Sequence, residues 1–444
     1  MQVAELLAAP VPAPPGNAPA VPASLDETGL SRRSLLNLAL KFMHVEACET
    51  VLDLAGRLKL PRRLAQKLVE EGVRQRLIGA TGASSDLALS TRYALTEAGR
   101  EAVREALDQS LYLGPAPVPL DAYRAQLDRQ MLASETIDEA ALREGFAGLV
   151  VPDHMVRRLL PAINAGRSVL LYGPPGNGKT TLSIRIARLF KNPVYIPHAV
   201  EVAGQIITVF DPQIHKPVAA EAEAEHPAGG ALGLRRDGFD RRWVACARPV
   251  VMAGGEMTLD MLDLKFSPDA RFYDAPLHVK ALNGMMLIDD FGRQKFTPDD
   301  LLNRWIVPME NRIDFLKLNT GASFTLPFDV LLMFSTNLQP GDLMDAAFLR
   351  RIQYKIKLFE PTREEYRRIF EAVARNSGLA LDDGVFGRVV ETLSPFGLAY
   401  YQPRFICDHA VEMCRSFGLP PVLTAELAGE AMANLYVDLD EAPG

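Results

Sequence analysis

One short stretch, from Leu170 to Thr181, limits the possible folds of this chain more than any other. It reads LLYGPPGNGKTT, an apolar strand followed by a glycine-rich loop, and the apolar-periodic run 182–187 comes next. From Gly173 to Thr180 the loop matches the spacing G-x-x-x-x-G-K-[ST], in which backbone N–H groups converge on phosphates. The helix that follows directs its positive end at the same point. The stretch therefore predicts a phosphate-binding loop between a buried strand and a helix.

The residue types in this loop predict ATP and Mg²⁺ as the cofactors. Lys179 is expected to contact the β- and γ-phosphates, and the Thr180 hydroxyl is expected to hold Mg²⁺. The other expected ATP-binding residues are Gly173, Pro174, Pro175, Gly176, Asn177, Gly178 and Thr181. A glycine-rich turn that happens to carry a lysine is the plain alternative, but it does not require this spacing between a strand and a helix.

Two further apolar runs end in polar residues, as strands do at the binding edge of a parallel sheet. The run 284–288 ends in Asp289 and Asp290, and the run 330–336 ends in Asn337. Parallel strands read as continuous apolar runs, and ligands bind at their carboxyl ends. We expect Asp289 to hold Mg²⁺ through water and Asp290 to orient the attacking water. Asn337 would contact the γ-phosphate or that water, although asparagine also favours ordinary turns at strand ends.

Three arginines complete the candidate site. Arg350 and Arg351 follow the segment Asp345–Leu349, and one of them could enter the site of a neighbouring subunit if the chain forms a ring. Such an arginine raises the rate about 10³- to 10⁵-fold in other NTPases. Arg404, near the start of a predicted helix, could reach the same phosphates. The alternative for Arg350 and Arg351 is an ordinary pair of surface arginines.

The order of these motifs resembles the AAA+ ATPases, and their detail is most similar to the MoxR-like branch. The resemblance covers about residue 145 to the C-terminus and includes Tyr273–Leu277, the helix at 302–310, a predicted hairpin at 312–328 and Asp345–Arg351. It implies a Mg-dependent ATPase that forms a homo-oligomeric ring, expected to be a hexamer, and acts on a protein partner. Two departures are Asp290, where most relatives carry glutamate, and a long insertion at 201–278.

The N-terminal part predicts a separate small domain. Three helical patterns, at about 34–43, 45–58 and 62–76, precede a two-stranded wing, and Thr96 is a plausible N-cap for a closing helix. This order, ending in YALTEAG, resembles winged-helix domains. Residues 31–110 hold 13 Lys or Arg against 10 Asp or Glu, so the domain is mildly basic.

The third of these helices is the candidate nucleic-acid or partner contact. Its basic residues are Arg62, Arg63, Lys67 and Arg74. They suit phosphate contacts, but surface helices are normally charged, and winged helices also bind proteins. Both interpretations stay open at the level of the sequence.

The predicted fold class is α/β, a P-loop parallel-sheet core with a C-terminal helical lid, plus an N-terminal winged helix-turn-helix. The expected domains are a disordered Ala/Pro-rich tail (1–30), the winged helix (31–112), a linker with a short helix (113–144), the ATPase domain (145–360) and the lid (361–444). Residues 193–196 are expected to form the second strand of the parallel sheet in the ATPase domain. The acidic patch at 219–225 is expected to be a mobile loop.

Composition narrows the function classes. A net charge of −7 argues against a protein that coats nucleic acid through bulk charge. The four cysteines show no C-x-x-C spacing, so neither a zinc ribbon nor a disulfide framework is predicted. No run reaches the roughly 18 apolar residues of a membrane span, and no signal peptide is evident, so the cytoplasm is the expected location.

Three functions fit these observations. The first is an ATP-hydrolysing ring that remodels a protein partner. The second is an ATP-controlled DNA regulator or loader that acts through the winged helix, and the third is an ATP-binding scaffold with little turnover.

Overall fold

The computed structural model describes residues 16–83, 91–218 and 238–436. The chain divides into two compact units. The first comprises the described parts of Met1–Glu135, Phe190–Met286 and Asp300–Leu331, and the second those of Thr136–Leu189, Leu287–Asp299 and Leu332–Gly444.

The second unit is built on parallel strands. They are β4 (Val169–Tyr172), β16 (Tyr354–Lys357) and the carboxyl ends of β15 (Val330–Thr336) and β12 (Gly284–Ile288), in the order β16-β4-β15-β12. Both β15 and β16 pair in parallel with β4. Every residue of β12 and β15 is buried, as their apolar runs require. The predicted P-loop parallel sheet is therefore confirmed.

Short helices accompany this sheet. They are α6 (Glu139–Gly145), α7 (Asp153–Asn164), α8 (Lys179–Ala187), α11 (Pro340–Leu343) and α12 (Ala346–Arg351). Helix α8 follows the glycine-rich loop directly, and the αL residue Gly178 is its N-cap. The predicted strand–loop–helix sequence is thus present.

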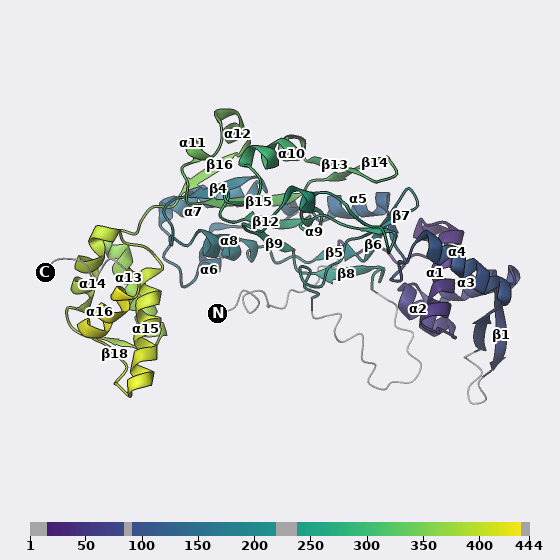
Figure 1. Ribbon diagram of the computed structural model, residues 1–444, viewed down its shortest axis with the longest axis horizontal. Helices are drawn as coiled ribbons and strands as arrows, with labels where there is room; N and C mark the ends of the chain where they lie inside the picture. Colours follow the sequence, from purple (N-terminus) through teal and green to yellow (C-terminus); the bar gives the residue numbers. More distant parts are fainter. Residues whose placement is uncertain (1–15, 84–90, 219–237, 437–444) are drawn as a thin grey trace. The chain divides into compact units, whose positions relative to one another are not determined.

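The C-terminal part of the second unit is a helical cluster (Figure 1). It consists of α13 (Arg363–Asn376), α14 (Val385–Leu393), α15 (Gln402–Phe417), α16 (Ala425–Ala433) and the short parallel pair β17 (Ala380–Leu381) and β18 (Val422–Leu423). Helix α13 begins with the predicted capping box, in which Thr362 and Glu365 satisfy each other's backbone N–H groups. Tyr366, Phe370 and Val389 are fully buried among these helices. The predicted helical C-terminal region is confirmed.

The first unit holds a second, mixed sheet. Its order is β10 (Lys265–Ser267), β11 (Phe272–Asp274), β7 (Gln205–Thr208), β6 (Ala199–Val202) and β3 (Val118–Pro119). Most of these strands belong to the insertion expected at 201–278, which is therefore folded where the structure describes it. The acidic patch at 219–225 lies outside the described residues.

One predicted strand pairs differently. Residues 193–196 were expected in the parallel core, but β5 (Val194–Pro197) forms an antiparallel pair with β8 (Trp243–Cys246). The strand beside β12 is instead β9 (Val250–Ala253). All of these runs are apolar, and an apolar run does not by itself specify its neighbour.

The predicted hairpin is confirmed in the first unit. Strands β13 (Ile313–Lys317) and β14 (Ser323–Pro327) pair in antiparallel register, with Phe315 opposite Thr325. The other elements here are η4 (Leu259–Leu262), α9 (Leu277–Lys280) and α10 (Pro298–Asn311).

The N-terminal module, residues 31–110, contains the predicted order of elements (Figure 1). They are α1 (Arg32–Val45), α2 (Val51–Leu58), α3 (Arg62–Arg74), the hairpin β1 (Ile78–Ala83) with β2 (Thr91–Leu95), and α4 (Glu97–Gln109). Thr96 caps α4 by accepting from the Gly99 N–H, as predicted.

The prediction of a disordered tail is wrong for residues 16–30. This segment contains a short 3₁₀ turn, η2 (Asp26–Thr28), and buries Leu25 and Leu30 in the apolar cluster of the N-terminal module. The Ala/Pro-rich composition suggested disorder, but the described segment supplies leucines to a core and backbone carbonyls to partners. Residues 1–15 lie outside the described residues.

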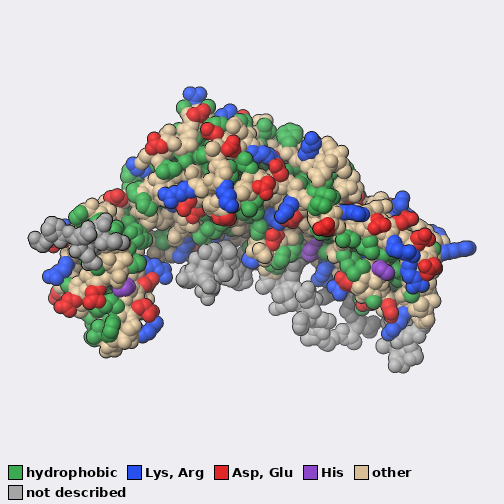
Figure 2. All heavy atoms as spheres, in the orientation of Figure 1, with side chains coloured by type: hydrophobic (Ala, Val, Ile, Leu, Met, Phe, Trp, Pro, Cys, Tyr) green, Lys and Arg blue, Asp and Glu red, His purple; other side chains and the backbone are tan. Residues whose placement is uncertain are grey.

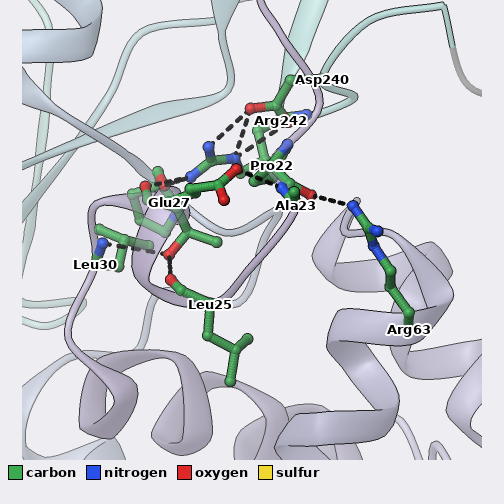
Figure 3. A network of polar contacts seen from close by, with 10 residues as sticks. Pro22, Ala23, Leu25, Glu27, Leu30, Arg63, Asp240 and Arg242 are labelled. Atoms are coloured by element: carbon green, nitrogen blue, oxygen red, sulfur yellow. Dashed lines mark hydrogen bonds and ion pairs between the residues drawn. The ribbon is translucent and has the colours of Figure 1, made fainter.

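A buried guanidinium fixes this segment in place (Figure 3). Arg242 forms a bidentate ion pair with Asp240 and donates Nη1 to the carbonyls of Thr28 and Pro117, at 2.9 and 3.1 Å. Thr28 precedes the N-terminal module and Pro117 follows it, so one side chain holds both of its connections. The stretch expected to be a linker is accordingly packed, with Val118 fully buried.

Helix α5 (Leu120–Arg129) and η3 (Leu132–Ser134) complete the first unit. Among the described residues, no helix is both long and apolar enough to cross a membrane.

Candidate nucleotide site

A cavity of about 730 Å³ lies within the second unit, and the predicted loop forms one of its walls. The sequence-predicted residues that line it are Pro175 to Thr181, Asp289, Asp290, Asn337 and Arg404. The structure therefore brings the loop, both strand ends and the start of α15 to one place. Gly173 and Pro174 are not among the lining residues.

The loop backbone has the conformations that its glycines permit. Gly173, Gly176 and Gly178 have φ values of 145°, 74° and 75°, in the region that other residues rarely adopt. A Cβ at Gly173 would lie 2.2 Å from the Leu358 carbonyl oxygen, and one at Gly176 would lie 2.1 Å from the Tyr401 ring. Glycine is thus required at 173 and 176 by close packing as well as by conformation.

Lys179 is folded back on its own loop. Its Nζ donates to the carbonyls of Gly173 and Pro174, at 2.9 and 2.8 Å. Burial lowers the pKa of Lys179, and the negative charges of Asp289 and Asp290 partly offset that effect. The ammonium therefore lies in the cavity beside two carboxylates, where a phosphate would be a stronger partner than two carbonyls.

Thr180 and Asp289 meet across the cavity floor. The Thr180 hydroxyl donates to Asp289 Oδ2 at 2.7 Å. This hydroxyl and carboxylate are oxygen ligands of the kind that Mg²⁺ prefers, with water and phosphate filling its other positions. Among the described residues, no group of three or more His, Cys, Asp or Glu is placed to bind a metal. The residues present thus fit Mg²⁺ bound together with a nucleotide.

Asp290 has an uncommon backbone conformation. Its φ is 48°, and the Asn337 amide donates to its Oδ1 at 3.3 Å. A left-handed conformation at a residue other than glycine costs about 1–3 kcal/mol and is found at functional sites. The contact between Asn337 and Asp290 joins the polar residues that follow two different strands, and both residues line the cavity.

Gln294 supports this turn and was missed from the sequence. Its amide nitrogen donates to the carbonyls of Asp289 and Asp290, at 2.9 and 3.3 Å. Its side-chain oxygen accepts from the Gly292 N–H at 2.9 Å. A lone glutamine four residues after an Asp-Asp pair carries no recognisable signal, so only the structure assigns it this position.

Asn177 has an unsatisfied side chain. It is 4% exposed, and neither its amide nitrogen nor its amide oxygen has a hydrogen-bond partner. A buried amide without partners costs free energy, so such a group points to a ligand or water that satisfies it. Its place in the cavity wall agrees with a polar ligand held by the loop.

An apolar wall of the cavity was also missed. It comes from the segment before α7 and from the C-terminal helices. The residues are Leu149, Val150, Val151, Met155, Ile369, Val373, Tyr400 and Tyr401. Sites for cofactors combine such apolar walls with a few placed polar groups, so this wall can accept a planar base. Widely spaced apolar residues without a shared motif do not reveal such a wall in advance.

The three predicted arginines fall into two groups. Arg404 lines the cavity, and its Nε donates to Asp408 at 3.2 Å. Arg350 and Arg351 do not line it. Arg351 contacts the Ala347 carbonyl and the Phe348 ring on its own short helix, α12. Neither residue is therefore placed to act in the cavity of its own chain.

The basic residues of α3 do not form one open row. Arg63 donates to the Pro22 carbonyl at 3.2 Å, and Arg74 pairs with Glu71 on the same helix. Arg62 also has an interaction, and Lys67 is exposed. On the face shown in Figure 2, acidic and basic side chains are mixed over the module. Residues 16–30 thus occupy part of the surface that was predicted to contact nucleic acid or a partner.

Together, the parallel sheet, the glycine-rich loop and the Thr180–Asp289 contact define a P-loop nucleotide-binding α/β protein. The strand-end acids and the asparagine stand around the loop in the order on which the resemblance to the AAA+ ATPases rests. One protein similar in sequence is known by its name. That relative is the vesicular-fusion protein sec18 of Schizosaccharomyces pombe, 27% identical over 197 residues. The match covers 41% of this chain and only 23% of that protein.

Other comparisons concern a family match to one segment of the chain and two solved structures. Residues 362–434, which include α13 to α16, match a family described as a domain of unknown function, DUF8689. The RuvB Holliday junction branch migration motor of Thermotoga maritima is 14% identical, with 73% of this chain and 74% of that chain covered and a TM-score of 0.35. NtrX of Brucella abortus in complex with ADP is 13% identical, with 78% and 68% covered and a TM-score of 0.41.

Proposed function

We propose that this protein is a Mg-dependent ATPase of the AAA+ type that works as a ring and remodels a protein partner. The observation that carries the proposal is the convergence of Lys179, Thr180, Asp289, Asp290 and Asn337 on one cavity. These residues were predicted from three separate motifs, which lie far apart in the sequence. Chance proximity does not explain a P-loop hydroxyl bonded to a strand-end carboxylate.

The geometry gives each residue a defined task. The loop N–H groups and the start of α8 would bind the phosphates, while Lys179 would exchange its two carbonyl partners for phosphate oxygens. Thr180 and Asp289 would hold Mg²⁺, which would neutralise charge developing on the phosphates. Asp290 would orient water for attack on the γ-phosphorus, with Asn337 holding the carboxylate and Arg404 close to the phosphates.

The ring follows from what the cavity lacks. Among the residues that line it, only Lys179 and Arg404 carry positive side-chain charge. Transferring a phosphoryl group benefits from a further cation, which Arg350 or Arg351 of a neighbouring subunit would supply. We propose a closed ring, a hexamer, in which the exposed Arg350 or the half-buried Arg351 reaches the next subunit.

The protein-remodelling role rests on the relative and on the N-terminal module. Sec18 is named as a vesicular-fusion protein, and this name favours a protein target over DNA. The mixed charges of the module and the engagement of Arg63 by Pro22 favour protein docking over DNA binding. We propose that residues 31–110 are a winged-helix module that recruits a protein, as in a MoxR-like chaperone.

Phosphate release tests the ATPase. Wild-type protein should release phosphate from MgATP, and Lys179→Ala should reduce the rate to background because the phosphates lose their cation. Lys295→Ala is a matched control, since this exposed lysine lies outside the cavity. Equal background rates in wild type and Lys179→Ala would leave an ATP-binding scaffold and refute the enzyme.

A trapped complex tests the partner. Asp290→Asn should bind ATP without hydrolysing it and should retain a protein target in a pull-down, whereas a form lacking residues 1–110 should not. Salt-dependent retardation of labelled duplex DNA, lost in an Arg62/Arg63→Ala variant, would instead establish the DNA-regulator function and overturn protein docking.

A further inference from the structure

A second cavity, of about 350 Å³, lies within the first unit. It is bordered by α1, by the end of α4 and by the turn between β6 and β7, so the N-terminal module forms one side and the inserted sheet forms the other. None of its lining residues belongs to the nucleotide cavity. Its charged lining residues are Lys41, Glu201 and Arg271.

Lys41 is a buried cation with few partners. Its side chain comes from α1, the residue is 5% exposed, and its ammonium donates to the Ser110 carbonyl. Among the described residues, the Ser110 carbonyl is its one hydrogen-bond acceptor, and no carboxylate forms an ion pair with it. Burial lowers the pKa of Lys41 to about 8. A buried charge without a counter-charge is costly, and proteins normally pair it.

Glu201 supplies the opposite charge on another wall of the same cavity. It lies on β6, and no hydrogen bond or ion pair joins its carboxylate to any residue that the structure describes. Burial raises the pKa of this carboxyl. Lys41 and Glu201 therefore share a cavity without pairing with each other.

The cavity thus holds a buried cation, Lys41, and a half-buried carboxylate, Glu201, that do not pair with each other, while its third charged residue, Arg271, is exposed. We propose that this cavity binds a small zwitterionic metabolite of the amino-acid class, with its carboxylate at Lys41 and its ammonium at Glu201. The cavity volume suits a small organic molecule, and its apolar lining by Leu30, Leu38 and Ile206 suits an aliphatic chain between the charges. Because the two charges lie on different parts of the unit, the ligand would tie the N-terminal module to the β6–β7 turn.

A plainer role for Lys41 is to cap α4. Ser110 follows the last residue of that helix, and cations are favourable at helix C-termini. Capping accounts for one N–H group of Lys41 and gives Glu201 no role. The two interpretations therefore predict different behaviour toward ligands.

Four six-carbon probes test whether binding requires a carboxylate, an ammonium group or both. Norleucine and 6-aminohexanoate each carry both charges at different spacing, whereas hexanoate and hexylamine each carry one. We expect calorimetry with the full chain to show binding of at least one zwitterion. Each one-charge probe lacks one charged hydrogen bond and should bind at least about tenfold more weakly, a difference of about 1.4 kcal/mol.

Variants test the assigned residues. Lys41→Met should remove zwitterion binding, Glu201→Gln should reduce it to the level of hexanoate, and Arg104→Met, which changes an exposed cation on α4, should leave it intact. Lys179→Ala should also bind the zwitterion normally, so failure of the ATPase proposal would be distinguishable. No binding by either zwitterion at millimolar concentration, or binding retained in both Lys41→Met and Glu201→Gln, would overturn the proposal and leave Lys41 as a helix cap.

Discussion

Two glycines of the P-loop share a backbone conformation but differ in their surroundings. Gly176 and Gly178 have φ values of 74° and 75°. A Cβ at Gly176 would lie 2.1 Å from the Tyr401 ring, whereas a Cβ at Gly178 would meet nothing within 4 Å. The pair therefore separates the cost of a left-handed conformation from the cost of a steric clash.

Gly176→Ala should weaken nucleotide binding more than Gly178→Ala. Both changes cost about 1–2 kcal/mol in conformation, and Gly176→Ala must also displace Tyr401 from the loop. Titration with a fluorescent ATP analogue measures the two dissociation constants. Adding Tyr401→Ala should rescue part of the Gly176→Ala defect, and equal defects in both single variants would contradict this role of Tyr401.

Lys41 predicts a pH dependence of stability. Its pKa is about 8 in the folded protein and near 10.5 in the unfolded chain, so the unfolded state binds more protons between these values. The free energy of unfolding of the wild type should therefore rise relative to Lys41→Met as pH increases from about 8 to about 10.5. Denaturant titrations of both proteins across this range measure the difference. The other charged groups of the cavity, Glu201 and Arg271, are present in both proteins. A constant difference across that range would contradict the prediction.

At the level of elements, the turn after β12 depends on one amide. Gln294 contacts the carbonyls of Asp289 and Asp290 and the Gly292 N–H. These contacts hold the acids that follow the strand while Asp290 keeps its left-handed conformation. The turn is thus positioned by a residue that does not line the cavity.

Gln294→Ala should lower kcat while changing KM for ATP much less. The substitution leaves partly buried backbone groups without a partner, at a cost of about 1–3 kcal/mol, and loosens Asp290, the carboxylate that we propose orients water. Steady-state phosphate release measures both constants, and Gln294→Glu, which keeps the acceptor for Gly292, should retain more activity than alanine. A kcat equal to that of the wild type would show that the turn does not need this amide.

Sequence patterns predicted the elements with strong local signals. The P-loop strand, the strands ending at Asp289 and Asn337, the hairpin and the C-terminal helices all carry their own periodicity, glycines or caps. Pairing was less predictable, since β5 is as apolar as the core strands but pairs with β8. The apolar wall, Gln294 and the packing of residues 16–30 were not predictable because each depends on segments brought together only by folding.

For the whole molecule, the proposed ring makes activity a property of the assembly. Arg350 and Arg351 lie outside the cavity of their own chain. The proposed ring places one of them at the nucleotide site of the next subunit. Removing it should therefore lower the ATPase rate of that neighbouring subunit.

Mixing two inactive proteins tests this arrangement. An Arg350→Ala/Arg351→Ala variant lacks the arginines proposed to act in the next subunit. The Lys179→Ala variant lacks the cation proposed to bind phosphate in its own cavity. In mixed rings, an arginine from the Lys179→Ala subunit can complete the cavity of the other variant, so part of the phosphate-release rate should return. Arg293→Ala, which changes an exposed arginine elsewhere in the second unit, should stay active alone. Mixtures that remain as inactive as their components would contradict an arginine shared between subunits.

The pair of carbonyls held by Arg242 has a consequence for how the N-terminal module meets a partner. A module on a free tether samples many positions, and its partner then experiences an effective concentration set by tether length. Here the segments that enter and leave the module, at Thr28 and Pro117, are bonded to the same guanidinium. A partner bound to the module would therefore be presented to the inserted sheet in one orientation, with little conformational entropy left to lose. The affinity of the partner would depend on how well its surface matches the module and the sheet. It would not depend on the length of chain that joins the module to the sheet.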